Sequence, residues 1–258
     1  MAPEISFTDD PLRMLRLFRF MSTIGFVPEE ETLAAVPALA ERLEIVSAER
    51  IRDEFSKLMV GDHVRDALWG LVETGVSDYF LPELSRLRME QDPVQRHKDV
   101  LAHTFAVVDK ASPDLVLRLA ALMHDIGKPD TREYGPRGVT FHHHEVVGAR
   151  ITRRRLKALR YPKEIVDDVG KLVFLHLRPH TFKMGWTDSA VRRYVRDAGP
   201  LLDDLNQLVR CDVTTANASR ALKIQRRIDE LEGAIADLRS REELAAIRPP
   251  INGHTVME

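Results

Sequence analysis

The feature that most constrains this sequence is an apolar segment, Leu115–Met123, that ends directly in the ionisable pair His124-Asp125. Apolar side chains occupy almost every position of the segment, which is typical of a helix buried on all sides. Ser112-Pro113-Asp114 precedes it as a helix start, and we expect Gly127 to close the helix in the left-handed conformation. A histidine and an aspartate are therefore expected at the buried end of a central helix.

The rest of the chain also has helical periodicity, with Pro and Gly at the breaks. We therefore expect an all-α protein. Asp10-Pro11 starts the first expected helix, as an acidic cap followed by a proline in the first turn. A loop is expected through Gly135 and Gly138. The expected helices span residues 12–21, 29–42, 50–59, 63–74, 81–88, 115–123, 144–159, 163–177, 188–198, 200–214 and 219–241.

The polar segment 90–96, which contains Pro93, is the expected boundary between two helical regions. We expect a first region at residues 1–90 and a second at 91–216. Residues 217–258 follow as a long charged helix and a final segment.

The composition excludes several classes of protein, but it does not indicate a binding partner. With 44% hydrophobic and 30% charged residues and a net charge of −2, the chain is no broadly basic nucleic-acid coat, although a local basic strip could bind RNA. Cys211 is the one cysteine, so an internal disulfide is excluded. We expect its side chain to be buried in a helix and the protein to be in a reducing compartment, the cytoplasm. Neither a leader peptide nor a run of membrane-spanning length is expected.

Helical spacing places several ionisable residues on apolar faces. His176 continues the face of Val169 and Leu172, and Asp212 continues that of Leu205 and Leu208. An ionisable group in a core is unfavourable unless it is paired or bound to metal, and metal ligation would satisfy all of these groups together. The candidate ligands are His103, His124, Asp125, His144, His176 and Asp212.

Each histidine alone has a simpler interpretation, because a single core histidine is more often hydrogen-bonded than metal-bound. Together the six favour metal, and mixed imidazole and carboxylate ligands suit Zn, Fe, Mn, Ni or Co over Ca, with room for one ion or two. Among the run His142, His143 and His144, the last is best placed by the helix that follows. The remaining candidates, His97, His180 and His254, are expected at the surface.

The order His103, His124-Asp125, Asp212 resembles the H…HD…D signature of the HD superfamily, and His144 and His176 resemble the further ligands of its two-metal members. The resemblance implies hydrolysis of phosphoester bonds by a metal-activated water. It assigns Asp125 to bridge the ions and Lys128 to stabilise charge on a phosphoryl oxygen. A cation at a helix C-terminus is the alternative interpretation of Lys128.

Three arginines spaced three apart, Arg13, Arg16 and Arg19, share one face of the first expected helix. A guanidinium binds a base edge or a phosphate in a fork that lysine cannot form. Together with Asp10 one turn earlier, Arg13 could offer donors and an acceptor to a nucleobase. The alternative is the solvated face of an amphipathic helix.

Asp9, Asp10 and Arg13 also match the acidic-Asp-x-x-Arg motif in the neck of bacterial CCA-adding tRNA nucleotidyltransferases of the poly(A) polymerase type. Residues 47–54 resemble the family's next neck segment and residues 79–84 resemble the element before its HD domain, so the likeness spans essentially the whole chain. The resemblance implies tRNA as partner and a cytoplasmic location. It also implies that Asp10 and Arg13 read CTP and ATP, supported by Arg16 and Arg19.

One departure from that family is large, because its nucleotidyl-transfer head carries a Gly-Gly loop and an Asp-x-Asp pair for Mg. Here none of the 13 glycines adjoin one another and no Asp-x-Asp occurs. We expect a headless part of such an enzyme: a truncated frame, a fragment, or one half of a split protein whose head is another chain. Mg with CTP or ATP then belongs only to the full-length parent.

The expected remaining activity is HD phosphohydrolysis of 2′,3′-cyclic or 2′-phosphorylated ends. One alternative is a noncatalytic RNA-binding module with a structural HD site, in which Arg153, Arg154 and Lys157 contact phosphates. Consecutive arginines fan around a helix, so they cannot form one face. The other alternative is a stand-alone HD nucleotidase, against which the neck-like first region counts.

Overall fold

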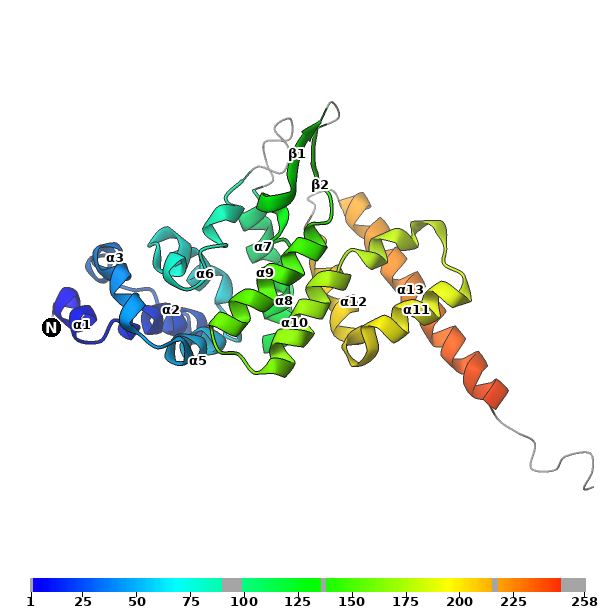
Figure 1. The fold of residues 1–258 in the computed structure, drawn as a ribbon, viewed down its shortest axis with the longest axis horizontal. Coiled ribbons are helices and arrows are strands. Elements are labelled where there is room, and N and C mark those ends of the chain that lie inside the picture. Colours follow the sequence, from blue (N-terminus) through cyan, green and yellow to red (C-terminus); the bar gives the residue numbers. More distant parts are fainter. Residues whose placement is uncertain (1, 90–98, 136–137, 215–217, 247–258) are drawn as a thin grey trace, which may run out of the picture.

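A computed structural model describes residues 2–89, 99–135, 138–214 and 218–246. Helices make up nearly all of the described chain, and the sheet within it is a single two-stranded hairpin (Figure 1). The expected all-α class is therefore confirmed. In the described part, no helix is both long and apolar enough to cross a membrane. The expected boundary at 90–96 and the final segment from residue 247 lie outside the described residues.

The first region is a group of short helices around α2, against which α5 and α6 pack. Gly25 ends α2 in the left-handed conformation with φ 65°, and the Ser47 side chain accepts a hydrogen bond from the Arg50 backbone N–H at the start of α5. The elements are α1 (Pro3–Asp9), α2 (Leu12–Ile24), α3 (Glu30–Ala34), α4 (Val36–Leu39), η1 (Ala40–Ile45), α5 (Ala48–Met59), α6 (Val64–Glu73), η2 (Val76–Tyr79) and η3 (Ser85–Leu87).

Three expectations for this region were wrong. The chain forms α1 before the first expected helix, and its Pro3 occupies the first turn, where a missing N–H is tolerated. The single helix expected at 29–42 is divided, because Pro37 cannot continue a helix and instead starts α4. Residues 81–88 form only turns and the short 3-10 helix η3.

The second region is built around α8 (Leu115–Met123), which contacts α5, α7, α9, α10 and α12. From Leu117 to Met123 every residue of this helix is buried, as expected for a helix enclosed on all sides. The other elements are α7 (Val100–Lys110), η4 (Lys128–Thr131), β1 (Arg132–Gly135), β2 (Gly138–Phe141), α9 (His144–Ala158), α10 (Lys163–Leu175), η5 (Arg178–Met184), α11 (Asp188–Ala198), η6 (Gly199–Leu201), α12 (Leu202–Cys211) and α13 (Ala218–Ala246).

Gly127 does not adopt the expected left-handed conformation, since its φ is −84°. The position instead needs glycine for close approach. A Cβ there would lie 2.3 Å from the His144 carbonyl oxygen and 2.6 Å from the Gly148 nitrogen, well inside contact distance. The turn after α8 is thus pressed against the start of α9.

The loop expected through Gly135 and Gly138 is in fact an antiparallel hairpin. Arg132 pairs with Phe141, and Tyr134 pairs with Val139. Four residues in each strand are too few for a clear alternating pattern, so periodicity alone did not separate this hairpin from a loop. It projects from the body of the molecule, and β2 leads into the start of α9 (Figure 1).

Candidate metal centre

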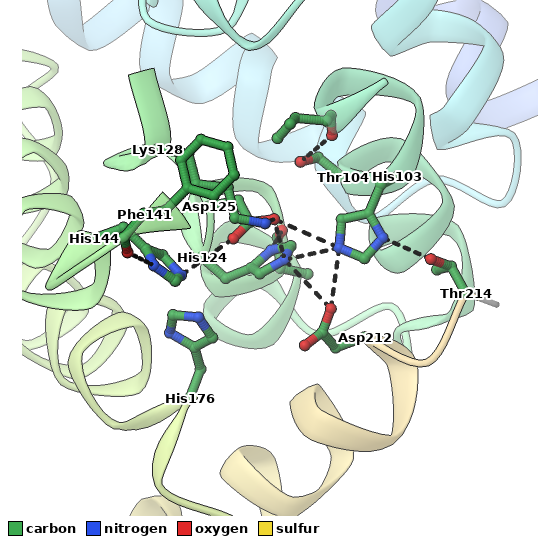
Figure 2. A network of polar contacts seen from close by, with 12 residues as sticks. His103, Thr104, His124, Asp125, Lys128, Phe141, His144, His176, Asp212 and Thr214 are labelled. Atoms are coloured by element: carbon green, nitrogen blue, oxygen red, sulfur yellow. Dashed lines mark hydrogen bonds and ion pairs between the residues drawn. The ribbon is translucent and has the colours of Figure 1, made fainter. Parts of the chain in front are cut away.

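All six expected metal ligands converge at one place, although they come from separate helices (Figure 2). His124 and Asp125 follow the last residue of α8, and His176 and Asp212 cap the C-terminal ends of α10 and α12. His103 lies within α7 and His144 is the first residue of α9. The buried helix α8 thus carries its terminal pair into the centre of the region.

Two groups of ligand atoms share Asp125. In the first, His103 Nε2 lies 3.2 Å from His124 Nε2, 3.5 Å from Asp125 Oδ2 and 3.0 Å from Asp212 Oδ1. In the second, the ligand atoms of Asp125, His144 and His176 lie within 4.8 Å of one another, with 3.4 Å between Asp125 Oδ1 and His144 Nε2. Asp125 therefore presents one carboxylate oxygen to each of the two groups.

Backbone carbonyls fix the orientation of three of the imidazoles. The Nδ1 atoms of His124, His144 and His176 lie 2.7, 2.8 and 2.6 Å from the carbonyl oxygens of Ala121, Phe141 and Val173. A carbonyl only accepts hydrogen bonds, so Nδ1 donates and Nε2 faces the centre, as in many metal sites.

One atom in this group indicates directly that a cation would fit. His144 Nε2 is buried and has no hydrogen-bond partner among the described residues. A buried polar atom without a partner is unfavourable, and a metal ion would satisfy it. The residues present therefore fit a divalent metal.

The carboxylates set the protonation of the centre. Burial opposes protonation of His124, but Asp125 and Asp212 outweigh it and raise the pKa of this imidazole to about 10. Burial, together with the charge on His124, lowers the pKa of His176 to about 3. Burial also opposes ionisation of Asp125, yet His124 and Lys128 hold its pKa well below the usual range. The ionised carboxylates of Asp125 and Asp212 therefore face the protonated imidazole of His124.

Lys128 lies against the centre. Its Nζ donates to Asp125 Oδ2 at 2.7 Å and lies 5.5 Å from the centroid of the Phe141 ring. Only 12% of its side chain is exposed. Lys128 thus lies both beside Asp125 and just after the C-terminal end of α8, so the helix C-terminal cation remains the alternative interpretation.

The arginines on the exposed face of α2 have partners within the first region. Arg13 donates to the carbonyl and hydroxyl oxygens of Ser6 at 3.2 and 2.9 Å, whereas Asp10 pairs with Arg50 at 3.3 Å. Arg13 and Asp10 lie one turn apart, with the Arg13 backbone N–H 3.0 Å from the Asp10 carbonyl oxygen, and their side chains have separate partners.

The other two arginines of that face meet one acid. Arg16 and Arg19 lie 3.4 and 3.0 Å from Glu54 of α5, whose side chain is only 7% exposed. Neither is the fully solvated side chain of the alternative interpretation.

The basic residues of α9 point in different directions, as expected for consecutive positions. Arg153 lies over α10, where a Cβ on Gly170 would come within 2.7 Å of its Nε. The Arg155 guanidinium donates to both carboxylate oxygens of Glu83, at 2.8 and 2.9 Å. Arg154 and Lys157 are exposed. Of the three expected RNA contacts, Arg153 is thus the least available.

Two family models match this chain. One, described as "Probable RNA and SrmB- binding site of polymerase A", matches residues 25–87. The other, the HD domain, matches residues 99–233, just over half of the chain. The chain belongs to the HD-domain family.

Relatives confirm the resemblance to CCA-adding tRNA nucleotidyltransferases over the neck and the HD domain. An A-adding tRNA nucleotidyltransferase of Deinococcus radiodurans is 31% identical over all of this chain and 61% of its own length. A CC-adding tRNA nucleotidyltransferase of Thermus thermophilus is 33% identical over 81% of this chain and 50% of its own. This chain thus spans between half and two thirds of these relatives.

A solved structure has the same fold. The Bacillus stearothermophilus CCA-adding enzyme in complex with CTP superposes with a TM-score of 0.55 at 21% identity, over 89% of this chain and 49% of that one. The two chains therefore share their fold over this length.

Two residues at these sites were missed in the sequence. His180, expected at the surface, lies on η5 with its Nε2 3.5 Å from Asp212 Oδ2, at the edge of the HD centre. It follows Pro179 in a 3-10 segment, so no helical spacing indicated it. Glu54 did leave a signal, because it is an acid on the apolar face of Ile51, Phe55 and Leu58. His142 and His143 are exposed, whereas His97 and His254 lie outside the described residues.

Proposed function

We propose that the HD domain of this chain is a metal-dependent phosphohydrolase that acts on 2′,3′-cyclic phosphates and 2′-phosphates at RNA ends. The observation that carries this proposal is the pair of ligand groups sharing Asp125, with imidazole Nε2 atoms directed inward. In this proposal tRNA is the RNA partner, because the relatives that match the chain are tRNA nucleotidyltransferases.

The residues divide the work as follows. The residues that would hold the divalent metal are His103, His124, Asp125, His144, His176 and Asp212. When bound, a divalent ion supplies Lewis acidity to a phosphoryl group and lowers the pKa of water. Lys128, anchored by Asp125, presents a positive charge where negative charge develops on a phosphoryl oxygen. The ligand set suits Zn, Fe, Mn, Ni or Co.

The test is hydrolysis by the purified chain after loading with each of these metals in turn. We expect at least one metal to bind, by elemental analysis, and to support hydrolysis of nucleoside 2′,3′-cyclic phosphates. Asp130→Asn serves as the matched control for Asp125→Asn, which removes a ligand carboxylate. Asp130 is an acid of η4 that pairs with Arg86 outside the centre. Absence of both bound metal and hydrolysis would refute the proposal.

We further propose that this chain alone does not add nucleotides to tRNA, because the Gly-Gly and Asp-x-Asp motifs of the head are missing from its sequence. Asp10 and Arg13, with Arg16 and Arg19, would then read CTP or ATP only together with a head supplied by another chain. Incorporation of CTP or ATP into tRNA by the purified chain with Mg would contradict this.

A second candidate is a noncatalytic RNA-binding module. The match of residues 25–87 to an RNA-binding family model and the exposed Arg154 and Lys157 favour it. Salt-dependent tRNA binding with no hydrolysis under any metal would support this candidate over the first.

A further inference from the structure

The hairpin beside the HD centre exposes a large aromatic side chain. Tyr134 on β1 is 70% exposed. The Arg132 guanidinium lies 4.7 Å from the centroid of its ring, so one face of the ring is covered and the ring is oriented. An exposed aromatic with a neighbouring arginine is the arrangement that proteins use to stack nucleobases.

The side of the hairpin that carries Tyr134 also carries residues close to the metal centre. Cross-strand partners point to the same side of a sheet. Arg132, Tyr134, Val139 and Phe141 therefore share one side, because Arg132 pairs with Phe141 and Tyr134 with Val139. The Arg132–Tyr134 contact agrees with this assignment.

Phe141 joins this side of the hairpin to the centre in two ways (Figure 2). Its ring lies 5.5 Å from Lys128 Nζ, which itself contacts Asp125, and its carbonyl oxygen fixes His144 Nδ1 at 2.8 Å. The Tyr134–Val139 pair lies two residues along the hairpin from the Arg132–Phe141 pair, which is about 7 Å at the rise of a β-strand. The spacing suits one nucleotide, with its base at Tyr134 and its phosphate at Lys128.

We propose that Tyr134 is a stacking platform for the terminal base of the RNA whose 2′,3′-cyclic or 2′-phosphate lies at Lys128 and Asp125. Arg132 orients the ring and adds positive charge beside the RNA backbone. The inference rests on the proposed function, and it names the substrate more closely: a phosphate attached to a nucleoside, in preference to a phosphoester without a base.

The first test compares Tyr134→Ala with the wild type on two substrates, a nucleoside 2′,3′-cyclic phosphate and the cyclic phosphate of propane-1,2-diol, which has no base. We expect KM for the nucleotide to rise about tenfold in the variant, with kcat within twofold, since stacking contributes to binding of the base. The base-free substrate should show no change. Tyr134→Trp should restore the nucleotide KM, and bound metal should stay equal in all variants.

Tyr79→Ala is the matched control, because Tyr79 is a partly exposed tyrosine of η2 in the first region. The inference is overturned if Tyr134→Ala leaves KM for the nucleotide unchanged or raises KM equally for both substrates. It is also overturned if Tyr79→Ala raises KM for the nucleotide as much as Tyr134→Ala does.

A binding experiment separates failure of this inference from failure of the proposed function. If the wild type hydrolyses neither substrate, the proposed function fails. Even then, the nucleotide should quench the tryptophan fluorescence of Tyr134→Trp more than that of the wild type. The base-free phosphate should quench the fluorescence of the two proteins equally. Equal quenching of both proteins by the nucleotide would overturn the stacking inference.

Discussion

At the scale of single residues, the centre depends most on Asp125, because both of its oxygens face ligand groups while Lys128 and His124 balance its charge. In Asp125→Asn an amide replaces a carboxylate that serves both groups. We expect loss of bound metal and at least a hundredfold loss of any hydrolysis. Elemental analysis after dialysis and the cyclic-phosphate assay measure the two effects. Retention of metal at the wild-type ratio would contradict the assignment of Asp125.

The raised pKa of His124 predicts that metal binding releases a proton. Below its folded pKa of about 10 this imidazole is protonated in the metal-free centre, and only the neutral form is a ligand. Affinity for metal should therefore rise with pH from 7 toward 10, by about tenfold per unit for one proton. His176, with its pKa lowered to about 3, is already neutral and releases none.

The measurement for this proton is calorimetric titration with metal at pH 8 in two buffers of different ionisation enthalpy. We expect at least one proton released per chain. Identical heats in the two buffers would show that His124 is neutral before metal binds.

At the scale of elements, helical spacing was enough to direct the six candidate ligands to one place, because each lies in or directly beside a helix with a clear apolar face. That they bind metal stays a prediction. The contacts of Arg16 and Arg19 could not be derived in the same way, because Glu54 comes from another helix and its partners depend on how α2 and α5 pack.

The hairpin and Gly127 show the same limit of local reasoning. The sequence around Gly127 is a good helix end, yet its backbone is determined by the approach of α9, which lies later in the chain. His180 likewise reaches the centre through a 3-10 segment without helical periodicity. Tertiary packing decided each of these positions.

The close approach at Gly127 predicts the effect of adding one methyl group. In Gly127→Ala the new Cβ would meet the backbone of His144 and Gly148, so the start of α9 must move. We expect a loss of roughly 1–3 kcal/mol in the free energy of unfolding, as for overpacked cores. Metal affinity should fall as well, since His144 moves with α9. Urea unfolding and metal titration measure the two effects.

Gly233→Ala is the control for that substitution, because nothing lies within 4 Å of a Cβ at this position of α13. Alanine also favours helix over glycine, so this variant should be neutral or slightly stabilised. Equal destabilisation of both variants would show that the contact at Gly127 is not the cause.

At the scale of the whole molecule, the two regions are joined by polar contacts that neither region's own sequence pattern indicated. Arg155 of α9 forks onto Glu83, and Ser56 of α5 lies 2.9 Å from the Tyr161 hydroxyl. The sequence predicted both helical regions, but it did not predict their junction, because these partners are 72 and 105 residues apart. Such contacts favour one relative placement of the first region and the HD domain.

Arg118 is the most buried link in this junction and explains the one charge inside α8. It is 5% exposed and donates to the carbonyl oxygens of Met59 and Gly61 in the first region and of Ala111 in the second. Burial lowers the pKa of Arg118, which means that removing this guanidinium from water disfavours its charged form. Arg118→Met keeps much of the volume and leaves three carbonyl groups without this donor.

We expect Arg118→Met to lower the free energy of unfolding by roughly 3 kcal/mol, because buried acceptors that lose their partner are costly. The region around α5 should also unfold before the HD domain, which hydrogen exchange would detect as earlier loss of protection in residues 48–59 than in 115–123. Arg193→Met, at an exposed position of α11, is the control and should change stability by less than about 0.5 kcal/mol. If both regions of Arg118→Met still unfold together with wild-type stability, Arg118 does not couple the first region to the helix that carries His124 and Asp125.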